Sequence, residues 1–161
     1  MKYKNIFFAL FLSAGLLFFA GQGAFAITNV PDLKINEHIH IENAHTLVAP
    51  SWLKNRPIYM DILNTGQKDD MLVGASSPIA ERVVLQYTHD YGQGVKTMRP
   101  LENQEILLPA RAHVWLKPGG MHLMLTGLKR PLRLGLEIPL KLEFLHSNPR
   151  HIKVIIQKQP D

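Results

Sequence analysis

The segment MHLML, residues 121 to 125, places His122 and Met124 two positions apart, directly after a Lys-Pro-Gly-Gly turn. Side chains in a β-strand alternate between faces, so these two would share one side and lie roughly 7 Å apart. Imidazole nitrogen and thioether sulfur are soft donors that suit Cu(I). The pair indicates a candidate site for a soft metal ion, although surface and packing roles also fit so short a motif.

The sequence contains no cysteine among its 161 residues. A soft-metal site must therefore use methionine and histidine, and no disulfide can stabilise the fold. A blue-copper electron-transfer centre uses a cysteine ligand, so a redox enzyme is the least expected class of protein. The sequence also lacks a GxSxG elbow, an HExxH motif and a glycine-rich phosphate loop. We expect a binding protein and not an enzyme.

The first 26 residues are typical of an export signal, with two early lysines, an apolar run over 6–20 and a closing Ala-Phe-Ala. The apolar run is short for a membrane-spanning helix, which needs about 20 residues. We predict cleavage after Ala26, a single domain over residues 27–161, no stable membrane span after cleavage, and a periplasmic location. The remaining chain has 16 basic and 13 acidic residues, a net charge of +3. It contains no basic block, so a nucleic-acid partner is not expected.

Short runs of alternating apolar and polar residues, separated by Gly, Pro, Asn and Asp, predict an all-β domain built as an antiparallel sandwich or barrel. The predicted strands cover residues 33–41, 57–66, 82–89, 105–109, 112–117, 121–127, 136–145 and 151–157. Residues 76–82 are predicted to form a single helical turn with Ser77 as its cap. Met60, Met71 and Trp115 fall on positions that predict core packing.

The remaining histidines are less informative. His38 and His40 alternate on one predicted strand face, which could form a second, harder site for Cu(II), Zn(II) or Ni(II). Solvated surface histidines are the simpler interpretation of that pair. Four others have no matched partner in sequence and are expected at the surface or in hydrogen bonds: His45, His113, His146 and His151.

Longer stretches of the chain carry a more specific signal. They read YMDILNTGQKDDMLVGASSPIAERVVL, then MRP, LKPGGMHLMLTGLKRPL and IPLKLEF. In these stretches the sequence resembles the periplasmic copper chaperone family PCuAC, over residues 35–158. The resemblance implies an exported, cupredoxin-like β-sandwich with Greek-key topology. It also implies Cu(I) binding through two histidines and two methionines, and copper supply to cytochrome c oxidase.

On this resemblance Met98 matches the first methionine ligand, and His122 and Met124 match the closing pair. Gln86 or Tyr87 occupies the position of the first histidine. The nearby His89 could replace that ligand, provided that a β-bulge turns it to the face of Gln86. Three soft donors still suit Cu(I), and the missing imidazole predicts weaker binding and an open position that favours release.

The predicted function is Cu(I) binding followed by handover. The expected partners are an oxidase subunit that receives copper or a thioredoxin-like companion chaperone, and both follow from the resemblance alone. Two alternatives remain open. One is a binding module on the same fold with a degenerate metal site. The other is a periplasmic copper-buffering protein that also uses its exposed histidines.

Overall fold

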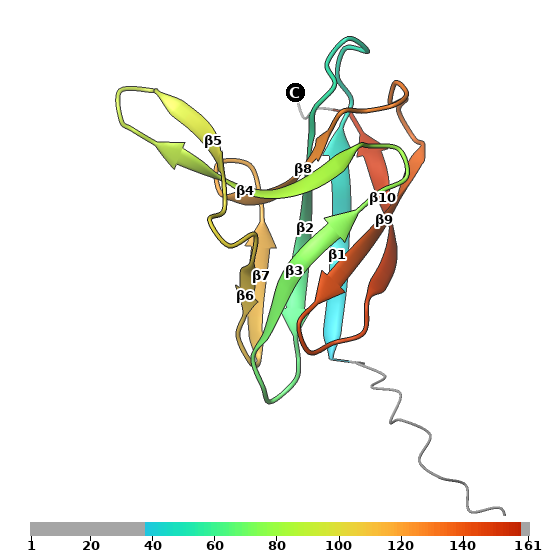
Figure 1. Cartoon of the computed structure of the whole chain (residues 1–161). Coiled ribbons are helices and arrows are strands. Elements are labelled where there is room, and N and C mark those ends of the chain that lie inside the picture. Colours follow the sequence, from blue (N-terminus) through green and yellow to red (C-terminus); the bar gives the residue numbers. More distant parts are fainter. Residues whose placement is uncertain (1–37, 159–161) are drawn as a thin grey trace, which may run out of the picture. The chain divides into compact units, whose positions relative to one another are not determined.

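The computed structural model describes residues 38–158, and its regular elements in that range are all β-strands (Figure 1). The predicted signal at 1–26 and the first half of the predicted strand 33–41 lie outside the described residues. The ten strands are β1 (Ile39–Leu47), β2 (Arg56–Asn64), β3 (Asp70–Ser76), β4 (Arg82–Asp90), β5 (Lys96–Pro100), β6 (Ile106–Leu108), β7 (Ala112–Leu116), β8 (Met121–Thr126), β9 (Glu137–Phe144) and β10 (Arg150–Gln157).

The all-β prediction is confirmed, and two details of local structure and strand pairing differ from the expectation. The segment predicted as one helical turn, 76–82, contains a single turn closed by Ala80 N, which donates to Ser77 O at 3.3 Å, but the Ser77 hydroxyl donates to Pro139 O at 2.7 Å and does not cap it. The pairing is also not wholly antiparallel, since β1 and β10 run parallel from His45 opposite Ile155. Over residues 38–158 no helix is long and apolar enough to cross a membrane.

The strands follow one another in the order β5-β4-β8-β2-β1-β10-β9-β3-β6, and β7 also pairs with β2. β2 therefore has two neighbours on one side. Its first residues, 56–58, pair with β8, and its later residues, 60–64, pair with β7. Residues 82–87 of β4 pair with β8, and residues 86–90 form a hairpin with β5 (Figure 1). This arrangement brings β8 and the β4–β5 hairpin together.

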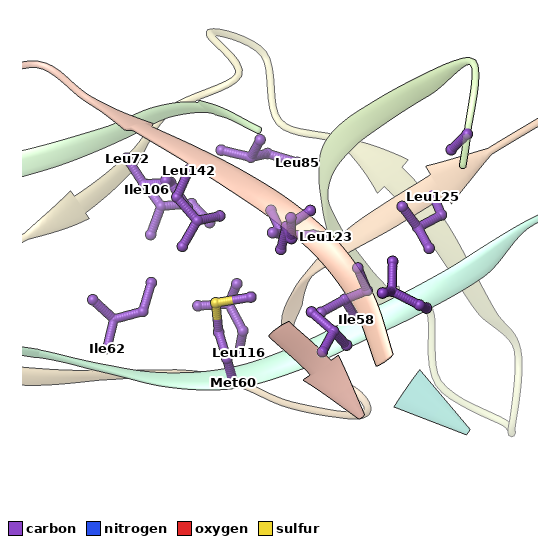
Figure 2. Close-up of a cluster of buried hydrophobic side chains, with 14 of the residues drawn as sticks. Ile58, Met60, Ile62, Leu72, Leu85, Ile106, Leu116, Leu123, Leu125 and Leu142 are labelled. Carbon is purple, nitrogen blue, oxygen red and sulfur yellow. The ribbon is translucent and has the colours of Figure 1, made fainter. Parts of the chain in front are cut away.

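The core determines which way each strand faces. Ile58, Met60 and Ile62 of β2 point inward and pack with Leu123 and Leu125 of β8 (Figure 2). Each fully buried aliphatic side chain of this kind contributes roughly 1.5–3 kcal/mol. Because neighbours in a strand alternate, the residues between these apolar positions must lie on the opposite face. His122 and Met124 are two of them.

The predicted core position of Trp115 is wrong. Its side chain is 53% exposed and its ring lies 4.6 Å from that of His113, which points the same way from β7. Leu116, the next residue, fills the core instead and is 2% exposed. Met60 is buried as predicted, whereas Met71 is only partly buried. The predicted alternation of β7 is correct, but its inner and outer faces are exchanged.

Gly127 follows β8 and lies close to Glu81, the residue before β4. Its φ is +69°, and a Cβ there would lie 2.5 Å from the carboxyl carbon of Glu81. We expect Gly127→Ala to lower the free energy of unfolding by more than about 1–2 kcal/mol, because the contact with Glu81 adds to the cost of a left-handed conformation for an L-residue. Urea titration measures the change.

Gly119→Ala is the matched control, because Gly119 has a φ of +77° and a methyl group added there would meet no other atom within 4 Å. The excess cost at Gly127 should disappear in a Glu81→Ala background. Equal costs at the two glycines in both backgrounds would show that the Glu81 contact has no effect.

Candidate metal site

β8 presents the histidine and methionine of the sequence motif on the face opposite the core. His122 and Met124 alternate with the inward Leu123 and Leu125. Both outward side chains are nevertheless buried, with 1% and 7% of their surface exposed. Burial removes the hydration of this histidine, so each ring nitrogen without a partner carries a free-energy cost.

The neighbouring strands place two more predicted positions on this face. On β4, Gln86 lies directly opposite His122 and Val84 opposite Met124. On β5, Met98 lies directly opposite Thr88 of β4. Thr88 is two residues after Gln86 and therefore points to the same side of β4. Directly paired residues point to the same side of a sheet. The three predicted donors therefore share one face, with Gln86 between β5 and β8.

Met98 and Met124 line the same groove, which has a volume of about 780 Å³. Met124 is almost fully buried, whereas Met98 is 53% exposed. The connection between β1 and β2 forms another wall of the groove. The other lining residues are Leu47, Val48, Ala49, Leu53, Asn55, Arg56, Pro57, Arg82, Val84, Gln86, Pro100 and Thr126.

One ring nitrogen of His122 is held by a backbone carbonyl, and His122 itself is not among the residues that line the groove. Its Nδ1 lies 3.0 Å from the carbonyl oxygen of Gly120, which can only accept, so the proton is on Nδ1. Nε2 then carries a free lone pair. This nitrogen is buried and has no hydrogen-bond partner. A buried acceptor without a partner costs about 1–3 kcal/mol, and a bound metal ion would remove that cost.

Tyr59 is a contact of His122 that the sequence analysis did not single out. Its ring lies 6.2 Å from the His122 ring in an edge-on arrangement, and 5.6 Å from the ring of His45. Burial raises the pKa of Tyr59, so the phenol remains neutral beside the imidazole. The alternation of Tyr59 with Ile58 and Met60 was the available signal, since it places this aromatic residue on the outer face of β2.

The structure places His89 away from the three other predicted donors. No register shift interrupts the pairing of β4 with β5 or β8, so His89 points to the face opposite Gln86. There its ring packs between Tyr87 and Tyr91, at 6.1 and 4.3 Å. The bulge on which its role depended is absent from β4. We therefore leave His89 out of the candidate site.

We expect His89→Ala to leave Cu(I) affinity unchanged, because the imidazole is on the wrong side of β4. A competition titration against a Cu(I) chelator measures this directly. A clear loss of affinity, with the β4–β5 hairpin intact by amide chemical shifts, would return His89 to the site.

The second, harder site considered for His38 and His40 receives no support from their surroundings. His40 Nε2 is 3.4 Å from the Thr65 hydroxyl oxygen, and both histidines are exposed. Over residues 38–158 no three His, Asp or Glu side chains are grouped so that they could hold a metal ion. The candidate site thus depends on thioether and imidazole donors.

Comparisons with known proteins define the class of this domain. The fold matches the copper-bound PCuAC domain from PmoF2 with a TM-score of 0.62 and 20% identity, over 76% of this chain and 94% of that one. It matches the solution structure of Cu(I)-DR1885 from Deinococcus radiodurans with a TM-score of 0.57 and 27% identity, over 73% of this chain and 76% of that one. The predicted resemblance to PCuAC domains and their cupredoxin-like fold is confirmed.

The sequence comparisons give the family. The model of the family described as "LpqE-like: Putative lipoprotein LpqE-like" matches residues 39–156. A putative lipoprotein of Leifsonia xyli subsp. xyli is 32% identical over 115 residues, which cover 68% of each chain. The protein belongs to the LpqE-like family.

Proposed function

We propose that this protein binds one Cu(I) ion through Met98, His122 and Met124 and passes it to a recipient protein. The observation that carries the proposal is the buried, unpartnered Nε2 of His122 on the same face as two methionines. The similarity to structures described as a copper-bound PCuAC domain and as Cu(I)-DR1885 supports it.

The chemistry of these donors favours Cu(I) over other metal ions. Thioether sulfur and imidazole nitrogen are soft, neutral ligands, and Cu(I) accepts them at low coordination number. Zn(II) in proteins is usually bound by four ligands, which include thiolate, imidazole or carboxylate. The cargo is therefore cuprous copper, and the protein acts as a carrier and not as an enzyme.

The surroundings of Met98 and Gln86 favour release. Met98 is half exposed on the edge strand β5, so a recipient can approach its sulfur from solvent. Gln86 offers a carboxamide, whose oxygen is a hard donor that suits Cu(I) poorly. One coordination position is consequently left for a ligand from the recipient. We propose an oxidase subunit or a thioredoxin-like companion chaperone as the exchanging partner.

The cellular setting of the proposal is the bacterial envelope. Residues 1–26 have the pattern of an export signal, and we propose cleavage after Ala26 and a periplasmic mature chain. The lipoprotein descriptions of the family and of the Leifsonia xyli relative are consistent with export. Outside the cytoplasm thioether ligands have the advantage that they cannot pair into disulfides.

An anaerobic competition titration of residues 27–161 with Cu(I) tests the proposal. We expect one equivalent to bind, with a strong loss of affinity in Met98→Ala and in Met124→Ala. Undiminished binding in both variants would place the copper elsewhere. Complete indifference of the wild-type chain to Cu(I) would favour a binding module with a degenerate site. More than one equivalent, reduced by His38→Ala and His40→Ala, would favour copper buffering.

A further inference from the structure

β5 is the first strand in the order of the sheet, and within residues 38–158 it pairs with β4 alone. Its outer edge is therefore open in the described part of the chain. All five residues of β5 are exposed, and the β4–β5 hairpin extends away from the other strands (Figure 1). An open edge presents unpaired N–H and C=O groups, to which a segment of another chain can add as a further strand.

The backbone of Met98 points towards this open edge. Thr88 of β4 lies directly opposite Met98, and its N–H donates to Gly120 O beside β8 at 3.1 Å. Residues that face each other in an antiparallel pair exchange either two hydrogen bonds or none. Because the N–H of Thr88 is turned towards β8, it exchanges none with Met98. The N–H and C=O of Met98 consequently point away from β4.

A second hydrogen bond of the hairpin agrees with this assignment. Leu101 N donates to Leu85 O at 2.9 Å, just after β5. Hydrogen-bonded positions recur at every second residue of the ladder, so Met98 and Lys96 both present outward backbone groups. Pro100 falls on the same outward set but has no N–H. β5 thus offers outward N–H donors at two positions, which predicts weak and quickly reversible pairing.

The charge of β5 indicates which kind of strand its edge accepts. Lys96 and Arg99 are its charged residues, and it contains no acidic residue. Asp90 of β4 lies 3.6 Å from Lys96, but both side chains are more than half exposed, so this ion pair is weak. Pairing of β5 with a second copy of itself would bring four positive charges together, and basic residues at strand edges oppose such pairing. An acidic segment has the complementary charge.

We propose that a copper-receiving protein docks on this edge by adding one antiparallel strand, an acidic extended segment with a soft side chain such as methionine directly opposite Met98. That residue would use both outward backbone groups of Met98, with the two Cα atoms about 5.5 Å apart. Directly paired residues point to the same side of a sheet, so its side chain would lie on the face of Met98, His122 and Met124. Strand pairing thereby positions a ligand for the exchange of copper.

The docking and its role in copper exchange have different requirements. The exchange role rests on the proposed Cu(I) site, whereas the strand edge is present in the metal-free chain. Docking can therefore be measured without copper. A failure of the copper site can then be told apart from a failure of the edge.

The first test titrates the metal-free chain with the blocked pentapeptide acetyl-Thr-Glu-Met-Thr-Glu-amide. Antiparallel pairing of its methionine with Met98 places its two glutamates opposite Arg99 and Lys96. The matched control is the same peptide with an N-methylated methionine, which keeps every side chain and charge but lacks one backbone donor. We expect the control to bind about tenfold more weakly, as the loss of a hydrogen bond with an unsatisfied acceptor predicts.

The position of the contact is read from ¹H–¹⁵N correlation spectra. The outward amides of Lys96 and Met98 should shift on titration, whereas those of Thr97 and Arg99, which are turned towards β4, should move less. The strand β6 at the other end of the order is an internal control. Its amides, at residues 106–108, should remain unchanged.

Two variants at one position separate the backbone bond from the charge. Lys96→Gln removes only the charge, and Lys96→Pro also removes the outward N–H. We expect the proline variant to bind the peptide several-fold more weakly than the glutamine variant. Unchanged amide shifts at residues 86–89 of β4 show that the hairpin is intact. Should Lys96→Pro disrupt the hairpin, the N-methylated peptide still decides the question.

The second test follows the release of copper from the Cu(I)-loaded chain to a chelator, by stopped flow under anaerobic conditions. The methionine peptide should accelerate release. The N-methylated peptide keeps the thioether but loses the docking, and a norleucine peptide keeps the docking but loses the thioether. Neither of these two should accelerate release, because exchange requires both features.

Equal binding of the peptide and its N-methylated control, or equal shifts at β5 and β6, would overturn docking at this edge. Concentration-dependent shifts of the Lys96 and Met98 amides without peptide would also overturn it, because a second copy would then occupy the edge. Docking without faster release from the Cu(I)-loaded chain would overturn the role in exchange. A chain that ignores Cu(I) would refute the proposed copper site and leave the docking result intact.

Discussion

His122→Ala is expected to reduce Cu(I) affinity by more than about 100-fold. Loss of a hydrogen-bond partner of a metal ligand already costs about 10- to 100-fold, and loss of the ligand itself should cost more. His122 provides the imidazole of the proposed set and is the donor whose free nitrogen is buried. A competition titration against a Cu(I) chelator under anaerobic conditions gives the affinity. The stoichiometry should fall from one equivalent towards zero at chelator concentrations that the wild type withstands.

Two controls make this result specific. His113→Ala removes an exposed histidine on β7 and should leave the affinity unchanged. Because His122 is buried, its removal also disturbs packing against Tyr59, so a second variant is needed. Met124→Leu keeps the volume of the side chain, costs less than about 1.5 kcal/mol of stability, and removes only the sulfur. Full affinity in a folded Met124→Leu variant and in His122→Ala would refute the site.

Gln86→His is expected to increase Cu(I) affinity by about 10- to 100-fold. Removing a hydrogen-bond partner of a metal ligand lowers affinity by about this factor, and an added ligand should raise it by at least as much. Gln86 of β4 lies directly opposite His122 of β8. Thr88, the next residue of β4 on that face, lies directly opposite Met98 of β5. An imidazole at this position would add a soft nitrogen between the existing donors. Release to a competing chelator should be slower in the variant, because the open position is filled. Stopped-flow transfer measures that rate.

Tyr87→His is the matched control for this gain. Tyr87 is adjacent in sequence but faces the other side of β4, opposite Met121. The sequence resemblance alone could not decide between Gln86 and Tyr87 as the position of the missing histidine. An equal gain from Tyr87→His would show that the pairing of β4 with β8 is shifted by one residue. No gain from either variant would mean that the donors are too far apart to share a fourth ligand.

Much of the fold could be predicted from alternation because the period of two is a direct consequence of strand geometry. The strands β3 and β5 could not be predicted in this way. β3 escapes prediction because Asp70 and Gly74 interrupt its apolar pattern, although Asp70 is buried and accepts the amide hydrogen of His146. β5 escapes it because its five residues are all exposed and form an edge strand without an apolar face.

The amino-acid sequence by itself determined which donors are available: no thiolate and a His-x-Met pair on one strand face, with a glutamine or tyrosine where the resemblance to PCuAC implies a histidine. Only the tertiary structure decided that Met98 shares the face of that pair, that His89 does not, and that Gln86 is the residue between them. Alternation gives the side of a strand but not its neighbours or its register. Those depend on long-range hydrogen bonds between strands and on which faces the core buries.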